Sequence, residues 1–376
     1  MTDLRAQRSA AWWHATAAWV VARVCVAISM VVSDLVADHL GAPAAKRLHL
    51  DQGLMTWDAT HYWSIAHRGY GGSPADSVRF FPLYPTLGWL GGLPIGGHEA
   101  LPLLIVSNVA ALLALVVLFR LVAEELGDAD LARRSVWCLA LFPAAGIMAF
   151  AYSESLALLL TLLALWSARR GRWWLAAFAA LCLGLTRPVG ALVVILLAGE
   201  AWRQRDRLVA ARSFRRLAAV ASALVAPVLG TLGYLLWIGG RFGDWMAPVD
   251  EQRKLRGAFQ DPFTRLWDAV SDVLGSSRVD VFNLGFALIL IAALVALVVS
   301  RRVPWGWWAF AAASLVVALS AQNFTSIGRY GIVAFPSAVG VAMLVRHREL
   351  ERGWLSLSAA AMCGYLVLTF VGGQVP

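Results

Sequence analysis

Residues 281–300 read VFNLGFALILIAALVALVVS, a run without a single charged side chain. An α-helix rises about 1.5 Å per residue, so this run is long enough to cross the hydrocarbon core of a bilayer, which is about 30 Å thick. Similar runs recur along the chain, which is 60% hydrophobic and 15% charged. Soluble domains are about 45–50% apolar and about 25% charged. The sequence therefore predicts an all-α polytopic membrane protein, and it excludes a soluble enzyme, a disordered tail protein and a disulfide scaffold.

About eleven membrane-crossing helices are expected, and residues 1–376 are expected to form a single integral membrane domain. The first span is longer than the apolar core of a signal peptide and is interrupted by Arg23, so it is interpreted as an uncleaved helix. The short spans within 135–168 and 173–202 are expected to be tilted or partly re-entrant. The predicted spans are 11–36, 101–122, 135–151, 154–168, 173–186, 188–202, 217–238, 281–300, 304–320, 329–345 and 354–372.

The basic residues predict the orientation of these spans. With the N-terminus in the cytoplasm, 19 of the 32 Lys and Arg residues fall in short inner connections, and every inner connection is basic. Basic residues in short loops are retained in the cytoplasm. The sequence thus predicts a multi-pass plasma-membrane protein with an inner N-terminus. Two long outer loops, 37–100 and 239–280, are expected to be structured, because loops of this length are usually functional.

The net charge of +9 fits this orientation rule better than a nucleic-acid partner. The arginine clusters lie between apolar spans and lack interleaved aromatic loops for base stacking. No nucleic-acid partner is therefore expected, and the lipid bilayer itself is the first predicted partner.

The first outer loop holds the densest polar and aromatic segment, residues 57–70, followed by 79–85. Asp58 follows Trp57, so one side of its carboxylate could be dry, which would make it a better base. The alternative is that Asp58 caps a helix over 59–67, and the pattern alone favours this cap.

Further polar segments from distant parts of the chain fall at the same outer face: 152–155, Arg187 with Pro188, and 323–330. This convergence predicts a site at the outer face. Arg23 and Arg187 lie within or beside apolar spans, where charged residues usually pair or serve a function. Each could hold a phosphate through its forked guanidinium, or could form a structural ion pair; snorkelling is a further alternative for Arg187.

At these residues the sequence resembles the PIG-V type mannosyltransferases. The resemblance extends over about 57–336. It rests on the following segments: Trp57-Asp58 with Tyr62, Ile65-Ala66 and Gly69-Tyr70; residues 80–85 (FFPLYP); Tyr152-Ser153-Glu154-Ser155; Arg187-Pro188-Val189-Gly190; and Arg329-Tyr330 with Phe335-Pro336.

The resemblance implies a GT-C type glycosyltransferase bundle that takes mannose from a polyprenyl-phosphate-mannose donor. The acceptor would be a glycolipid or a glycan on the extracytoplasmic face, and the configuration would be inverted. Asp58 would be the general base, with Glu154 as second choice or as a group that orients the acceptor. Arg187, Arg329 and Arg23 would bind the donor phosphate. No metal and no cofactor are expected. The expected substrate-binding residues are Trp57, His61, Tyr62, Arg79, Tyr84, Tyr152 and Tyr330.

Two other functions stay open from the sequence. A transporter or lipid flippase would line its pathway with Arg23 and the broken short spans, but it predicts polar residues near the midplane of several helices, whereas here they gather at the outer ends. A GT-C enzyme that acts on protein hydroxyls differs from the preferred interpretation only in its acceptor.

Overall fold

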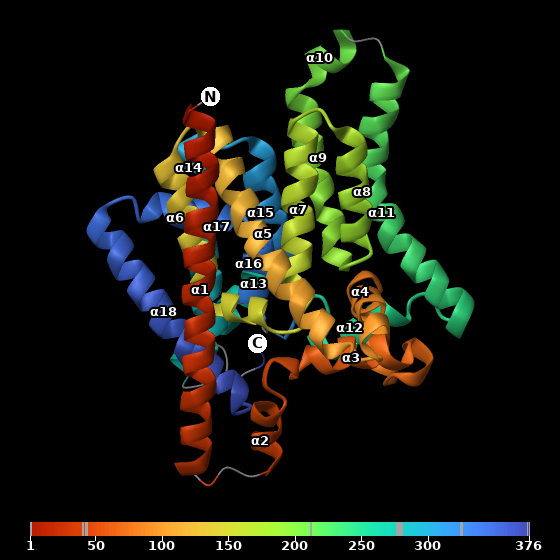
Figure 1. The fold of residues 1–376 in the computed structure, drawn as a ribbon, viewed down its shortest axis with the longest axis vertical. Helices are drawn as coiled ribbons and strands as arrows, with labels where there is room; N and C mark the ends of the chain where they lie inside the picture. Colours follow the sequence, from red (N-terminus) through yellow and green to blue (C-terminus); the bar gives the residue numbers. More distant parts are fainter. Residues whose placement is uncertain are drawn as a thin grey trace.

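The computed structural model describes residues 2–39, 41, 44–210, 213–275, 281–323, 326–373 and 375 (Figure 1). Within these ranges the chain is helical, with one isolated β-bridge between Phe259 and Ala321, which confirms the predicted all-α membrane fold. The helices (α) and 3-10 helices (η) are α1 Thr2–His39, α2 Ala44–Asp51, η1 Gly53–Met55, α3 Asp58–Arg68, η2 Tyr70–Gly72, η3 Ala75–Arg79, α4 Leu83–Gly92, η4 Leu93–Ile95, α5 Ala100–Leu126, α6 Ala129–Ala140, η5 Pro143–Ala149, α7 Glu154–Arg169, α8 Trp173–Gly184, η6 Pro188–Leu192, α9 Val193–Arg203, α10 Arg205–Ala210, α11 Phe214–Phe242, α12 Ala247–Arg256, α13 Pro262–Leu274, α14 Val281–Ser300, α15 Trp305–Leu319, α16 Ile327–Val333, α17 Pro336–Leu344 and α18 Arg348–Phe370.

Five of the described helices, α1, α5, α11, α14 and α18, are long and apolar enough to cross a membrane. Two bent pairs, α6 with η5 and α16 with α17, raise the number to seven if each pair is one span; they bend by 76° and 95°. The break within 135–151 agrees with the expectation of tilted or partly re-entrant short spans there, whereas the break within 329–345 was not predicted. Pro143 and Pro336 explain the breaks, because proline lacks a backbone N–H and disfavours helix in the residue before it.

The remaining predicted spans are shorter than a full crossing. α7 has 16 residues, α15 has 15, α8 has 12 and α9 has 11. The predicted span 188–202 is split into η6 and α9, since Pro188 begins a separate turn. These helices pack on one another and on the longer helices, and their backbone N–H and C=O groups bond within each helix, because the hydrocarbon core offers no partners.

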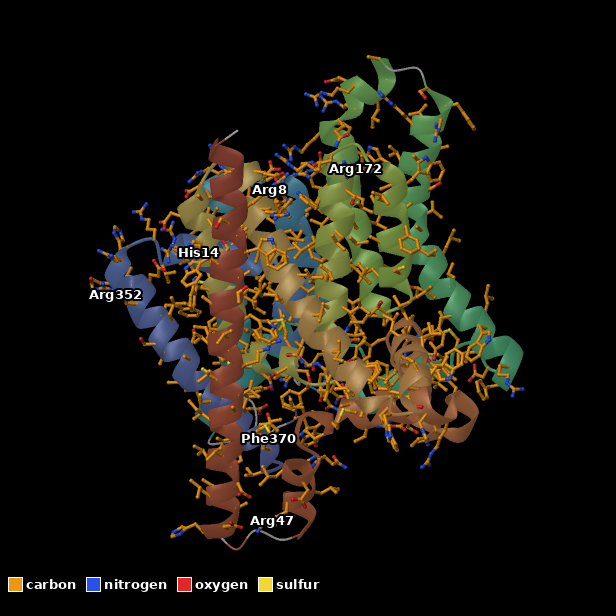
Figure 2. The ribbon with its side chains drawn as sticks, in the orientation of Figure 1. Arg8, His14, Arg47, Arg172, Arg352 and Phe370 are labelled. Carbon is orange, nitrogen blue, oxygen red and sulfur yellow. The ribbon has the colours of Figure 1, made fainter. Side chains whose placement is uncertain are left out.

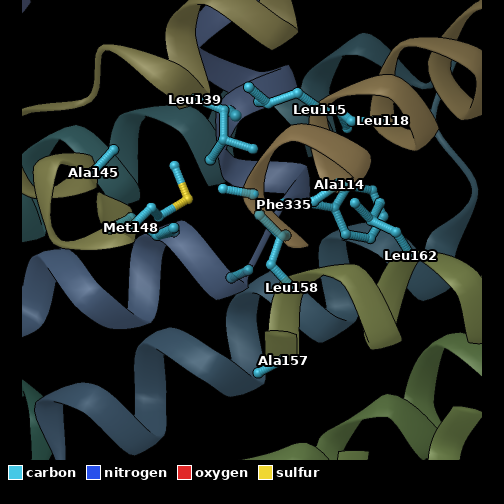
Figure 3. Close-up of a cluster of buried hydrophobic side chains, with 14 of the residues drawn as sticks. Ala114, Leu115, Leu118, Leu139, Ala145, Met148, Ala157, Leu158, Leu162 and Phe335 are labelled. Atoms are coloured by element: carbon cyan, nitrogen blue, oxygen red, sulfur yellow. The ribbon is translucent and has the colours of Figure 1, made fainter. Parts of the chain in front are cut away.

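The centre of the bundle is formed by α5, α6, α7 and the broken elements η5 and α16–α17. Figure 3 shows Leu115 of α5, Leu139 of α6, Met148 of η5 and Leu158 of α7 around Phe335, and all five are at most 1% exposed. Phe335 lies at the break between α16 and α17. The core thus holds both bent elements that lead into the polar cluster described below.

Helices α8 and α11 approach each other at glycines. A Cβ atom on Gly184 would lie 2.1 Å from the carbonyl oxygen of Pro227, and one on Gly230 would lie 2.5 Å from that of Leu181. Membrane helices gain little from the hydrophobic effect between them, so close backbone packing at small residues supplies much of their association. The hydroxyl of Thr231 shares its proton between the carbonyl of Gly184 in α8 (3.3 Å) and that of Pro227 in its own helix (3.1 Å), and the contact with Gly184 links the two helices.

The segment 37–100 folds as short helices rather than as an irregular loop. It contains the end of α1, then α2, α3 and α4 with the intervening 3-10 turns. In Figure 1 these elements lie toward the end of the bundle opposite the N-terminus. A helix expected over 59–67 occurs as α3, one residue longer at each end.

Candidate active site

Asp58 is the first residue of α3, and its carboxylate points to an arginine rather than capping the helix. No side-chain capping bond occurs at this helix start, and Oδ2 of Asp58 lies 2.7 Å from Nη1 of Arg329 in α16. The backbone N–H of Asp58 donates to the hydroxyl of Tyr152 (3.2 Å). The favoured alternative from the sequence, a capping aspartate, is therefore wrong.

Trp57, just before Asp58, has φ 56° and ψ −126°. Such a conformation costs a non-glycine residue of order 1–3 kcal/mol and is found mainly where the surroundings enforce it. Two contacts enforce it here: Nε1 of Trp57 donates to the carbonyl of Thr369 at the end of α18 (3.1 Å), and its ring stacks on His49 with centroids 4.0 Å apart. Trp57 thus anchors the start of α3 to α18.

Glu154 joins two arginines at the start of α7. Its Oε1 accepts a hydrogen bond from Nε of Arg329 (2.5 Å) and lies 2.5 Å from Nη1 of Arg187. Asp58, Arg329, Glu154 and Arg187 consequently form one ion-pair chain. Its members come from α3, α16, α7 and the connection between α8 and η6, so four distant parts of the sequence meet there.

The two carboxylates of this chain differ in exposure. The side chain of Glu154 is 0% exposed, whereas that of Asp58 is 22% exposed. Asp58 can therefore reach a molecule outside the protein, while Glu154 holds the two arginines in place. The second oxygen of Glu154, Oε2, is buried without a hydrogen-bond partner in the described structure.

A layer of tyrosines supports the ion-pair chain. The hydroxyls of Tyr62 and Ser153 are 2.6 Å apart, and Tyr84 donates to the carbonyl of Leu103 (2.8 Å). The guanidinium of Arg329 lies over the ring of Tyr152, 4.9 Å from its centroid. Burial and the Glu154 charge raise the pKa of Tyr62, so its phenol stays neutral. These tyrosines position Ser153, Glu154 and Arg329.

Ser107 and Asn108 extend this support from the middle of α5. Ser107 donates to the carbonyl of Tyr152 (2.6 Å), and the amide of Asn108 donates to the carbonyl of Ala149 (3.1 Å). The structure thus identifies two residues that the sequence analysis missed. The available signal was a Ser-Asn pair inside an otherwise apolar span, because polar side chains in membrane helices usually bond to neighbouring helices.

A small cavity lies beside both arginines of the chain. Its lining combines the two guanidinium-bearing residues with mostly apolar side chains from α7, α8, η6, α15 and α16: Ala157, Thr161, Leu183, Arg187, Val189, Gly190, Phe310, Ser314, Arg329, Tyr330 and Val333. Its volume is about 20 Å³, which is room for about one water molecule, so a larger ligand would enter only if the surrounding helices moved apart.

A second hollow, of about 530 Å³, runs between α3–α4 and α11. Trp89 and Trp237 on its opposite sides are 46% and 49% exposed. The two hollows are separated by the end of α8, since Leu183 lines the cavity and Leu185 lines this groove.

Arg23 takes no part in the ion-pair chain. Its Nε donates to Oδ1 of Asn108 (3.0 Å), its Nη2 donates to the carbonyl of Met148 (3.0 Å), and it stacks over Trp19. These contacts give Arg23 a structural role within the bundle, although the partners are neutral groups rather than the acid of the expected ion pair. They brace η5, the turn that leads into Tyr152 and Glu154.

His61 and Arg79 lie together on the side of α3 that faces η3. Nδ1 of His61 is 2.9 Å from the hydroxyl of Ser77, and Arg79 lies 3.6 Å from Asp76 and over the ring of Phe80. Burial lowers the pKa of His61, and the charge of Asp76 opposes this shift. Their expected substrate contacts stay a prediction.

Tyr330, which lines the cavity, binds a further arginine. Its hydroxyl accepts a hydrogen bond from Nη1 of Arg256 (2.5 Å), whose guanidinium also lies over the Tyr330 ring. Arg256 ends α12 in the second long loop and also binds the carbonyl of Ala318 (3.2 Å). The sequence analysis missed it, since charges in long loops carry little orientation signal and Arg256 shares its run with exposed Arg253 and Lys254.

Within the described ranges, no group of three or more His, Cys, Asp or Glu side chains gathers as a metal site. The carboxylates of the candidate site instead face arginines. The expectation that transfer needs no metal stays a prediction.

Comparison with known proteins bears on the same region. No curated protein and no solved structure matches the chain significantly. Residues 18–195 match the sequence model of a family described as Mannosyltransferase (PIG-V). This range includes Asp58, Tyr152, Glu154 and Arg187, whereas Arg329 lies beyond it. The match confirms the resemblance that the sequence motifs indicated: residues 18–195 are similar to the PIG-V mannosyltransferases.

Proposed function

We propose that the protein transfers mannose from a polyprenyl-phosphate-mannose donor to a hydroxyl of a glycolipid or polysaccharide, with inversion at the anomeric carbon. The observation that carries this proposal is the ion-pair chain in which Arg329 joins Asp58 to Glu154, with Arg187 at its end. It sets one accessible carboxylate beside two guanidinium groups, which is what an acid–base group and a phosphate leaving group require.

Asp58 is the general base in this proposal. It is the more exposed of the two carboxylates, and Arg329 fixes its orientation. Asp58 takes the proton of the acceptor hydroxyl while the acceptor oxygen forms a bond to the anomeric carbon. The bond from that carbon to the phosphate oxygen breaks, and its electron pair leaves with the phosphate. Attack opposite the leaving group inverts the configuration.

Arg187 and Arg329 stabilise the departing phosphate. Both line the cavity beside the ion-pair chain, and guanidinium groups bind phosphate oxygens in a forked geometry. Apolar Phe310 of α15 and Val333 of α16 line the same cavity, and this cavity must widen to admit the phosphate and the start of a prenyl chain. The groove between Trp89 and Trp237 is the proposed approach of the acceptor, because exposed indole rings pack well against sugar rings and acyl chains.

The proposed face is extracytoplasmic, in the plasma membrane. Figure 2 places Arg8 and Arg172, from two arginine-bearing ends predicted to be cytoplasmic, toward one end of the bundle. Figure 1 places α3, which carries Asp58, toward the other end. A lipid-linked donor fits a site on that face, where cytosolic sugar nucleotides are absent.

The test uses the purified full chain in nanodiscs with radiolabelled polyprenyl-phosphate-mannose. Parallel reactions receive a membrane glycolipid extract, a Ser/Thr-rich peptide, or GDP-mannose in place of the lipid donor, each with and without EDTA. We expect label in glycolipid, from the lipid donor alone, insensitive to EDTA and released by α-mannosidase.

Other outcomes contradict defined parts of the proposal. Transfer to the peptide alone would show that the acceptor is a protein hydroxyl and not a glycolipid. Transfer from GDP-mannose would show that the donor is a sugar nucleotide and not a lipid-linked sugar. Loss of transfer in EDTA would refute the metal-independent mechanism. No transfer in any reaction, together with movement of the donor across the bilayer of sealed proteoliposomes that contain the protein, would favour a flippase.

A further inference from the structure

A hollow of about 580 Å³ with an entirely charged lining lies at the end of the bundle away from Asp58. It is formed by the start of α6 and by the connection from α17 into α18. Its lining residues are Asp130, Arg133, Arg134, Arg346, Arg348, Glu351 and Arg352. Five arginines thus face two carboxylates, which leaves an excess of positive charge around a space far larger than the roughly 30 Å³ taken up by one water molecule.

Both carboxylates of this hollow are occupied by arginines of α6. Arg133 makes a two-armed ion pair with Glu351, with Nη1–Oε1 and Nη2–Oε2 distances of 2.5 and 2.9 Å, and also bonds to Asp130. Arg134 pairs with the other oxygen of Asp130. These contacts tie α6 to α18 and form a fixed floor, so the acids are not free to neutralise the remaining arginines.

Arg346 and Arg348 line the same hollow without partners. Both are exposed, and neither makes a hydrogen bond or ion pair within the described chain. Arg352 contacts only the exposed Glu349 among the described carboxylates, at 3.3 Å. Two guanidinium groups, those of Arg346 and Arg348, are therefore available to an anion above the ion-paired floor, with Arg352 beside them, and phosphate oxygens match their geometry.

The surroundings of the hollow favour a lipid as the source of that phosphate. α18 begins at Arg348 and is one of the helices long and apolar enough to span the membrane. Leu350 and Leu357, seven residues apart and so on one face of α18, are 56% and 67% exposed. An acyl chain could lie along this face while its headgroup enters the hollow.

We propose that this hollow, which we call the α6–α18 basic pocket, binds the phosphate of an anionic phospholipid headgroup. Basic pockets between membrane helices recognise such headgroups by charge and fork geometry. The pocket is separate from the candidate active site: α18 spans about 34 Å at 1.5 Å per residue between Arg348 and Phe370, and it is the far end, at Thr369, that contacts Trp57.

The experiment counts lipids bound to the purified full chain by native mass spectrometry in detergent. The probes are dioleoyl phosphatidylglycerol, dioleoyl phosphatidylcholine, inorganic phosphate and glycerol 3-phosphate. The pocket variant is Arg346→Gln with Arg348→Gln. The matched control is Arg172→Gln with Arg207→Gln, which removes the same charge from exposed positions outside the pocket. Thermal unfolding verifies that both variants fold.

We expect phosphatidylglycerol to bind wild type at least about tenfold more tightly than phosphatidylcholine, and the pocket variant to lose about tenfold in that affinity while the control changes by less than about twofold. Equal losses in both variants would overturn the proposal in favour of diffuse attraction to a basic surface. Binding of the soluble phosphates as tight as that of phosphatidylglycerol would also overturn it, because the ligand would then need no lipid.

Discussion

The guanidinium of Arg329 lies 2.7 Å from the carboxylate of Asp58 and also binds Glu154, so residues from both halves of the chain share one ion-pair chain. This relationship sets the orientation of the proposed base and brings the proposed phosphate ligands beside it. The site also depends on the bend at Pro336, because this bend lets α16 reach the starts of α3 and α7.

Replacing Arg329 by lysine keeps the charge and removes the fork. A lysine reaches one of the two carboxylates as a point charge, so the orientation of Asp58 is lost. We expect the initial rate of mannosyl transfer to fall by about 10²–10³-fold, the usual loss of one preorganised donor. Arg253→Lys, at an exposed position of α12, serves as control. Wild-type rates in Arg329→Lys would contradict the role assigned to this residue.

Replacing Glu154 by glutamine leaves two buried arginines with one fewer counter-charge. Removing one partner of a buried ion pair costs about 3–5 kcal/mol in the free energy of unfolding. The same change at Glu349, whose side chain is 83% exposed, should cost less than about 0.5 kcal/mol. Denaturation of both variants in mild detergent compares them. Similar stabilities would show that Glu154 does not hold the two arginines.

Substitutions of Arg23 and Arg187 should differ in their effect on the KM for the donor. Arg187 lines the cavity, so Arg187→Gln should raise the KM for the donor by about tenfold, as expected for one lost charge-assisted bond. Arg23 binds Asn108 and Met148 instead, so Arg23→Gln should lower the melting temperature and leave that KM unchanged. A raised donor KM in a stable Arg23→Gln variant would restore Arg23 as a phosphate ligand.

The crossing of α8 and α11 predicts opposite effects for two glycines of one helix. A methyl group at Gly230 would overlap the carbonyl of Leu181, so Gly230→Ala should destabilise the fold by about 1–3 kcal/mol. Gly233 has no atom within 4 Å of the corresponding position, so Gly233→Ala should be neutral or stabilising by up to about 1 kcal/mol. Thermal unfolding distinguishes the two; equal effects would argue against this close crossing.

His61 should make stability depend on pH. Burial lowers its pKa in the folded state, so the unfolded chain binds the proton more readily. Its contribution is complete above the unfolded value of about 6.5 and is lost as the pH falls through the folded value. His61→Phe keeps a ring against Phe80 and should reduce the drop in melting temperature between about pH 7.5 and about pH 5. An unchanged drop in melting temperature would exclude His61 as a source of this pH dependence.

The sequence predicted the fold class because apolar runs such as 281–300 fold locally; that run is α14, residue for residue. It also predicted that Asp58, Glu154, Arg187 and Arg329 share a site, since charge-based topology assigned them to one face. The pairing within that group depends on tertiary structure: the bends at Pro143 and Pro336 decide which residues meet. A periodic pattern shows neither bend angle.

Individual roles were harder to predict for the same reason. Arg23 and Arg187 look alike in the sequence, as single arginines within or beside apolar spans. Only the folded structure shows that the guanidinium of Arg23 is hydrogen-bonded to the side chain of Asn108 in α5 and to the carbonyl of Met148 in η5. Arg256 was hidden in an exposed charge run, and its contact with Tyr330 arises because the C-terminal end of α12 reaches α15 and α16 in the folded chain.

The most direct test of the account is the initial rate of mannosyl transfer by Asp58→Asn, measured with polyprenyl-phosphate-mannose and the glycolipid extract beside wild type. Asp51→Asn, an exposed carboxylate of the same segment, is the control. We expect a loss of about 10²–10⁴-fold in Asp58→Asn, the usual contribution of a positioned base, at a temperature where its melting profile shows the variant to be folded, and a wild-type rate in the control. A wild-type rate in folded Asp58→Asn would contradict the account.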